Sequence, residues 1–550
     1  MTRTPPPFDV ESARHRAQNR STVAAHRGMV CTSQPLATAT GLRVLAEGGN
    51  CIDAAIAANA VLSVVEPAMC GLGGDLFALV WWEEDRRLHG LNASGRAPAG
   101  WSLDEAKRRG VHSIEQVSPL SWTVPGCVDG WSRLSERFGR RPWAELLLPA
   151  AEYAEEGFAL SPIISTHFDF RAERLPHLAR VFQPNGRPPK FGDSFRNPDL
   201  ARSLREIAER GASIFYSGRI AERIEAKARE LGGYLSVADL EAHRSEWVEP
   251  LSTDYRGWRV WELPPNGQGV TALQMLNLME RFDLAEMGHL SADHLHLLIE
   301  AKRLAFEDRA RFLADPAANP LPIEQLISKE YAAERSRSID LQRAAQTVVS
   351  GPWSDSETVY LTVADGAGNM ISLIQSIYKG FGSCICPDDV GFPIQNRGEG
   401  FSLDPRHPNC LAPGKRPFHT IIPAFVTRDE EPVLSFGVMG GDFQPQGHAQ
   451  VLSSMLDFGC SPQQAGDAAR VEHRGSSEPW GAAGSKAGLG EVVCELGVSS
   501  DVCEELARRG HRVCREAVAH GGYQAIWRCE EPRTYFGASD ARKDGLALGW

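Results

Sequence analysis

Apolar and polar positions alternate most regularly in residues 358–364, where valine or leucine occupies every second position and threonine or tyrosine stands between. This period of two predicts a half-buried β-strand. Residues 365–369 contain aspartate, glycine and asparagine, which favour tight turns, and a second apolar run follows over residues 371–375. The two runs and the turn between them predict a β-hairpin.

Two helices are predicted near the N-terminus. Ser33 and Pro35 are typical of a helix start, with serine as the cap and proline in the first turn. Asn50 starts a second helix, which extends to Val65 and is apolar nearly all round. A helix without a polar face is expected to be buried.

The rest of the chain changes character twice. A glycine cluster at residues 71–74 precedes a predicted strand, which indicates tight backbone packing, since a phosphate-binding loop follows a strand instead. From about residue 140 to 345 the pattern is mostly helical, whereas residues 432–436 predict a strand and residues 446–458 a helix. Helices before strands, then strands before helices, suggest stacked sheets covered by helices on both sides.

Composition narrows the class of protein. The 550 residues are 42% hydrophobic and 23% charged with a net charge of −12, which is globular and argues against nucleic acid as a partner. No apolar run has the length of a membrane span or signal peptide. The 12 cysteines are scattered, and one C-x-C pair is a poor zinc pattern. We therefore expect a cytoplasmic protein with reduced cysteines and neither a metal nor another cofactor.

Thr358 is the candidate for chemistry, and two interpretations are open. A threonine within a strand is most often only a good β-former. If the chain were cut between Glu357 and Thr358, however, the threonine would be a nucleophile whose own α-amine acts as the base. Residues 351–356 are polar and rich in turn formers, so that they could form an exposed, cleavable loop.

Several motifs lie along the chain from about residue 29 to 550, namely residues 47–55, 65–67, 71–74, 123–126, the 358–369 hairpin, 380–382, 413–417, 440–441, 521–522 and 537–540. In these motifs together the sequence resembles the gamma-glutamyltransferase family of N-terminal-nucleophile hydrolases.

The resemblance implies a four-layer αββα sandwich made as one chain and self-cleaved into two interlocked subunits. Residues 1–27 would be a flexible tail, residues 28–357 a helix-rich large subunit and residues 358–550 a small subunit. Thr358 would be the nucleophile, with Ser376 supporting it. The N–H groups of Gly440 and Gly441 would form an oxyanion hole, although a simple strand-to-helix turn also explains this glycine pair.

The positions that read the γ-glutamyl group in this family are changed here, to Ser94, Tyr378, Gly400, His419 and Thr420. Arg96 lies two residues from the position of the family's carboxylate-binding arginine, and Arg397 has appeared near the lost acidic residue. Because an arginine fork prefers a carboxylate, these changes favour a small anionic amide, as in oxamate amidohydrolases. The candidate substrate-binding residues are Arg96, Tyr378, Arg397, His419 and Thr420.

Two alternatives stay open. Arg96 could bind the carboxylate of a true γ-glutamyl substrate such as glutathione, or the chain could be an unprocessed, non-catalytic binding protein. Arg397 and His419 could also be purely structural. The expected partners are a small amide and water or an amine acceptor, with no nucleic acid and no membrane. The two subunits come from one precursor, and a homodimer of this pair is left open.

Overall fold

Two seven-stranded sheets, stacked face to face, form the centre of the computed structural model, which describes residues 20–345, 357–475 and 490–550. The first sheet has the order β1 (Val23–Ala25), β18 (Arg533–Ser539), β17 (Tyr523–Glu530), β13 (Glu431–Val438), β12 (Ala424–Arg428), β9 (Trp258–Glu262) and β8 (Leu251–Tyr255). The second has the order β19 (Leu546–Gly549), β2 (Gly28–Thr32), β10 (Glu357–Asp365), β11 (Met370–Tyr378), β3 (Asp75–Trp82), β4 (Arg87–Ala93) and β7 (Glu246–Val248).

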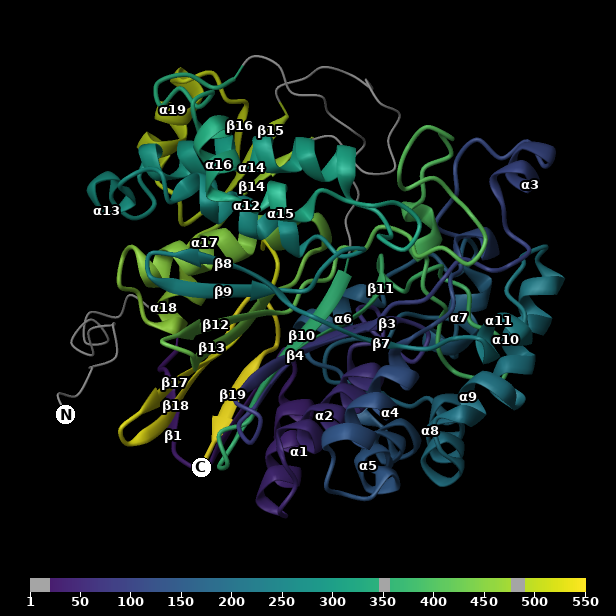
Figure 1. The fold of residues 1–550 in the computed structure, drawn as a ribbon. Coiled ribbons are helices and arrows are strands. Elements are labelled where there is room, and N and C mark those ends of the chain that lie inside the picture. The colour runs from purple at the N-terminus through teal and green to yellow at the C-terminus, as the bar shows by residue number, and fades with distance from the viewer. Residues whose placement is uncertain (1–19, 346–356, 476–489) are drawn as a thin grey trace.

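Helices cover the outer face of each sheet, so that the predicted four-layer αββα sandwich is confirmed (Figure 1). The helices on the side of the second sheet are α1 (Pro35–Ala46), α2 (Cys51–Val65), α4 (Cys127–Phe138), α5 (Trp143–Glu156), α6 (Pro162–His167), α7 (Pro176–Phe182), α8 (Pro198–Arg210), α9 (Ser213–Ser217), α10 (Arg219–Glu230) and α11 (Val237–Glu241). Those on the side of the first are α12 (Gly269–Met279), α13 (Leu284–Met287), α14 (Ala292–Phe312), α15 (Ile323–Leu326), α16 (Lys329–Ser336), α17 (Gln444–Leu456), α18 (Pro462–Asp467) and α19 (Ser500–Arg508). Helix α3 (Leu103–Arg108) lies apart from these layers, in a separate apolar cluster with Phe401 and Leu411.

Short elements complete the described chain. They are the small sheet of β14 (Val471–Arg474), β15 (Glu491–Glu495) and β16 (Val513–Glu516), the pair β5 (Phe158–Ala159) and β6 (Ser194–Phe195), and the 3-10 turns η2 (Pro119–Ser121), η3 (Arg397–Gly400) and η4 (Gly441–Phe443).

The alternation predicted for residues 358–364 is what positions β10 between two layers. Val359, Leu361 and Val363 pack into the apolar core beneath α2. Tyr360 points the other way, into the core between the two sheets, where Phe425 and Ile526 of the first sheet also lie. Strand β10 is therefore a central strand buried on both faces.

Most predicted elements are found, with small shifts at their ends. Helix α2 starts after Asn50, whose side chain accepts the N–H groups of Ile52 and Asp53 as expected of an N-cap. Helix α1 is capped by Gln34 instead of Ser33. In the glycine cluster, a Cβ on Gly74 would lie 2.3 Å from the backbone oxygen of Ser376, so the prediction of tight packing is confirmed.

The mostly helical pattern predicted for residues 140–345 is wrong for the stretch that forms β7, β8 and β9. Strands β8 and β9 form a hairpin whose turn, Arg256 and Gly257, has φ angles of 54° and 81°. Both residues lie in the left-handed region, as a two-residue hairpin turn requires. The apolar alternation on each side of this turn is short. A pattern judged over the length of a typical helix therefore does not reveal these two strands.

Three further observations bear on the predicted ends and surfaces of the chain. Strand β1 lies within the predicted flexible tail of residues 1–27 and pairs with β18, so that prediction is wrong for residues 23–25. Residues 1–19 lie outside the described residues. The predicted cleavable loop at residues 351–356 lies outside the described residues. Among the described helices, none combines the length and the apolar character that crossing a membrane requires.

Candidate active site

Thr358 is buried at the start of β10, at an irregularity in its pairing with β11. Glu357 pairs with Tyr378 and Val359 with Gln375, so that Thr358 alone faces two residues of β11, Ser376 and Ile377. A bulge of this kind aims a side chain away from the regular ladder. Here it brings two hydroxyl groups from adjacent strands together.

The Thr358 hydroxyl donates to Oγ of Ser376 at 3.4 Å, a long hydrogen bond. The same oxygen accepts the backbone N–H of Tyr378 at 2.8 Å. Tyr378 has a φ of 82°, an unfavourable conformation for a residue with a side chain, and strain of this kind clusters at functional sites. Ser376 is thus held as a fixed neighbour of Thr358.

Arg397, in η3, joins this hydroxyl pair. Its Nη2 donates to Ser376 Oγ at 2.9 Å and its Nη1 to Thr420 Oγ1 at 2.8 Å, while its guanidinium carbon lies 4.4 Å from the centre of the Tyr378 ring. The side chain is 1% exposed, and its Nε has no acceptor in the described structure. Burial lowers the pKa of Arg397 to about 10, so that it stays a cation at neutral pH.

Arg397 differs from the other fully buried arginines. Arg309 pairs with Asp442 at 2.6 Å and Arg470 with Asp540 at 2.8 Å. Within the described residues, Arg397 makes hydrogen bonds to hydroxyl groups and forms no ion pair. A buried cation without a carboxylate partner costs stability.

His419 and Thr420 follow one another beside Arg397. Nε2 of His419 donates to Asp75 at 3.1 Å, and its Nδ1 accepts the N–H of Ile421 at 3.3 Å. Burial, followed by the charge of Arg397, lowers the pKa of His419 to about 4. His419 is therefore a neutral, fully hydrogen-bonded side chain, which favours the structural interpretation over a catalytic one.

Gly440 and Gly441 lie between β13 and α17 with φ angles of 109° and 52°. Only glycine adopts this pair of conformations readily. Neither N–H donates to a protein acceptor within the described residues. On β10 and β13, Thr362 meets Ser435 and Tyr360 meets Gly437 across the two sheets. The same two-residue step leads from Tyr360 to Thr358 on β10 and from Gly437 to Met439, the residue before Gly440, just past the end of β13.

Three residues that sequence reasoning missed hold this site together. Asp75 pairs with Ser376 across β3 and β11, and it accepts the N–H groups of Gly95 and Gly126. Gln268 donates to the backbone oxygens of Thr420 and Gly441, both at 2.8 Å. Arg309 in turn donates to Gln268 at 2.7 Å. The glycine cluster before Asp75 is a sequence pattern that could have identified Asp75, whereas no sequence pattern marks Gln268 or Arg309.

The comparison with known families agrees with this geometry. Residues 37–550 match the model of the family described as gamma-glutamyltranspeptidase. The chain belongs to the gamma-glutamyltranspeptidase family. Because the match extends over nearly the whole chain, the enzyme class and the N-terminal-nucleophile fold follow from it together.

Individual members of the gamma-glutamyltranspeptidase family are similar over the full length. A "glutathione hydrolase-like YwrD proenzyme" of Bacillus subtilis is 38% identical over 96% of this chain and 100% of its own length. An oxamate amidohydrolase proenzyme of Klebsiella pneumoniae is 34% identical over 96% of this chain and 99% of its own. The crystal structure of a cephalosporin acylase from Bacillus halodurans superposes with a TM-score of 0.89 at 41% identity, over 97% of both chains.

Arg96, the alternative carboxylate binder in this member of the family, lies in a different network. Its Nη2 donates to Glu246 at 3.0 Å, and its Nη1 contacts Asp315 at 3.5 Å. Ser94, at the position of the family arginine, is buried and donates to Asn92 at 2.7 Å. The structure thus gathers Thr358, Ser376, Tyr378, Arg397, His419 and Thr420, and it leaves Arg96 with acidic partners of its own.

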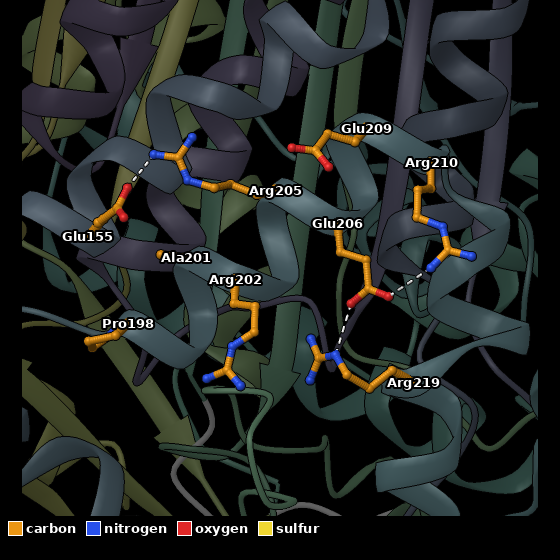
Figure 2. A pocket seen from close by; sticks show the side chains of 9 residues that line it. All are labelled: Glu155, Pro198, Ala201, Arg202, Arg205, Glu206, Glu209, Arg210 and Arg219. Atoms are coloured by element: carbon orange, nitrogen blue, oxygen red, sulfur yellow. Dashed lines mark hydrogen bonds and ion pairs between the residues drawn. The ribbon is translucent and has the colours of Figure 1, made fainter.

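A surface pocket beside α8 contains none of these residues (Figure 2). Arginines line it, but Arg205 pairs with Glu155, and Arg210 and Arg219 both pair with Glu206. The pocket therefore presents compensated charge on the surface, in contrast to the unpaired cation of Arg397.

Proposed function

We propose that this chain is a self-processing amidohydrolase that hydrolyses a small amide carrying a carboxylate, and that Arg397 binds this carboxylate. The observation that carries the proposal is the buried guanidinium with only hydroxyl partners beside Thr358. A guanidinium has five N–H donors, and two serve Ser376 and Thr420. The remaining donors include the unpartnered Nε–H, so that a fork for an anion is available.

The spacing favours a short substrate. Ser376 Oγ lies 2.9 Å from Arg397 and 3.4 Å from Thr358, so the guanidinium nitrogen and the threonine hydroxyl are at most about 6 Å apart. A carboxylate bound to Arg397 would place an adjoining amide carbonyl within reach of Thr358. Oxamate, in which the two groups are directly bonded, is the simplest such molecule, and one relative is an oxamate amidohydrolase.

Self-processing would begin at the bond between Glu357 and Thr358. The Thr358 hydroxyl attacks the carbonyl carbon of Glu357, the C–N bond breaks, and an ester joins the two residues. The hydroxyl proton passes to the departing nitrogen, so that this step frees the Thr358 amine. Water then hydrolyses the ester, which leaves a carboxylate on Glu357 and regenerates the Thr358 hydroxyl. The long hydrogen bond to Ser376 keeps the hydroxyl beside this peptide bond.

The mature site would use the same hydroxyl again. The Thr358 amine takes the hydroxyl proton, the oxygen attacks the amide carbonyl, and the N–H groups of Gly440 and Gly441 stabilise the oxyanion. The intermediate expels ammonia or an amine, which carries away the proton. Water, or an acceptor amine, then takes the acyl group from Thr358.

The other substrate-binding candidates would act through Arg397. Thr420 accepts from one arm of the guanidinium, and the Tyr378 ring lies along it, so that both fix its plane. His419, neutral and bound to Asp75, would hold the backbone on which Thr420 sits.

The twelve cysteines are all free, which supports a reducing compartment such as the cytoplasm.

The test compares two substrates with the purified, mature protein. We expect release of ammonia from oxamate at a kcat/KM well above that for release of the aniline from a γ-glutamyl anilide. The reverse preference would favour the γ-glutamyl alternative. Turnover of neither substrate, together with an uncut chain, would favour the non-catalytic binding protein.

A further inference from the structure

A second cluster of buried, chemically capable side chains lies apart from the active-site residues. His296 and Glu300 are one turn apart on α14, and His511 follows α19. One potential ligand atom from each lies within 4.8 Å of the others. All three are at most 6% exposed. The proposed amidohydrolase mechanism uses none of them.

The hydrogen bonds of His296 set its protonation. Its Nε2 lies 2.8 Å from the backbone oxygen of Asp340, which can only accept, so the proton is on Nε2. Nδ1 then carries a lone pair and lies 2.7 Å from Nε2 of His511. A histidine that donates one N–H to a backbone carbonyl while its other nitrogen faces a ligand-type group is the usual arrangement at a metal.

Glu300 is oriented in a similar way. Nη1 of Arg303 donates to one of its carboxylate oxygens at 2.6 Å, and the N–H of Ala345 reaches the other at 3.3 Å. Each oxygen has two lone pairs, so that a further bond can form at either. The carboxylate therefore faces the two histidines with its position fixed from behind.

We propose that His296 Nδ1, Glu300 and His511 Nε2 bind one Zn²⁺ ion. Two imidazoles and a carboxylate suit this ion, with water as the fourth ligand. Without the ion, one proton lies between His296 Nδ1 and His511 Nε2. The zinc ion replaces this proton, and His511 then carries its proton on Nδ1 instead of Nε2. Two zinc–nitrogen bonds at a tetrahedral angle place their nitrogens about 3.3 Å apart. The two rings, whose nitrogens are 2.7 Å apart, must therefore separate by several tenths of an ångström when the ion binds.

The ion would join parts of the chain that lie far apart in sequence. His296 and Glu300 precede Thr358, and His511 follows it. With the cut proposed above, the zinc would link the two fragments after processing. This consequence rests on the proposed function, whereas the metal site itself does not.

The experiment measures zinc bound by the full chain after stripping with a chelator and titration with ZnCl₂. We expect about one ion per chain in the wild type. His511→Gln and Glu300→Gln should each weaken zinc binding by at least about 100-fold, since loss of even an outer partner of a ligand costs 10- to 100-fold. His289→Gln, at a histidine outside the cluster that contacts Ser454, is the matched control and should bind as the wild type does.

Thr358→Ala separates this proposal from the proposed function, because the uncut chain should bind the same amount of zinc. If His511→Gln fails to fold, Co²⁺ is added to the wild type in place of zinc and its visible absorption is measured. Strong absorption, which requires a low coordination number, is the result expected for the proposed site. A folded wild type that binds no zinc, or variants that bind it as tightly as the wild type, would overturn the proposal.

Discussion

Nη2 of Arg397 lies 2.9 Å from the hydroxyl oxygen of Ser376. That oxygen is also the acceptor for the Thr358 hydroxyl, so one serine touches both the candidate nucleophile and the candidate anion binder. The proposed sites of substrate recognition and bond cleavage are therefore adjacent. The predictions below separate the two contributions.

Arg397→Met should abolish recognition of an anionic amide while leaving self-processing intact. Truncating one partner of a buried charge pair costs about 2–5 kcal/mol, so kcat/KM for oxamate should fall by about 30-fold or more, mainly through KM. Steady-state kinetics measure this fall. Arg406→Met, at an exposed arginine that pairs with Asp404, is the control and should change little. Unchanged oxamate kinetics in Arg397→Met would contradict the assignment.

Ser376→Ala should slow both self-processing and turnover. The substitution removes the acceptor for Thr358, Arg397 and the Tyr378 N–H at once. We expect kcat to fall by about 10- to 100-fold, as loss of a positioned hydrogen bond generally costs 1–3 kcal/mol. Ser376→Thr restores a hydroxyl and should recover most of the rate. Equal rates in the alanine and threonine variants would show that the hydroxyl has no role.

Gly440→Ala should lower turnover more than it lowers stability. The glycine has a φ of 109°, and an added Cβ would lie 3.2 Å from Cα of Gly521. Displacing an oxyanion-hole donor costs about 100-fold or more in kcat. Gly110→Ala, at a φ of 68° with open space around it, is a control for conformational strain alone. If both variants keep wild-type kcat, Gly440 forms only a turn.

Acidification should destabilise the protein through His419. Its pKa is about 4 in the folded chain because of burial, against about 6.5 when unfolded, so the unfolded chain takes up a proton first as pH falls. The stability is complete above pH 6.5 and is lost between pH 6.5 and 4. At pH 5 the loss amounts to about 2 kcal/mol. Urea unfolding at pH 8 and pH 5 should show a smaller difference in His419→Gln than in the wild type. An identical pH dependence would contradict this assignment.

Local sequence patterns predicted the elements that carry the site, because those elements depend on near neighbours. The Thr358 strand, its turn and the Asn50 cap are examples, since alternation and capping are local effects. The hairpin around Arg256 and Gly257 was missed because each of its strands is only five residues long.

The chemistry of Arg397 could be predicted only in part. Its charge is visible in the sequence, and the resemblance placed it near the substrate. Its burial, and its hydrogen bonds to Ser376 and Thr420, come from three segments that meet only in the folded chain. The same holds for Gln268, whose two acceptors lie more than 150 residues away.

The mass of the intact purified protein tests the central claim, that Thr358 is a nucleophile released by self-cleavage. We predict two fragments for the wild type, one ending at Glu357 and one beginning at Thr358, and a single inactive chain for Thr358→Ala. A wild type that stays in one piece yet is active, or an alanine variant that is cut and active, would contradict the account.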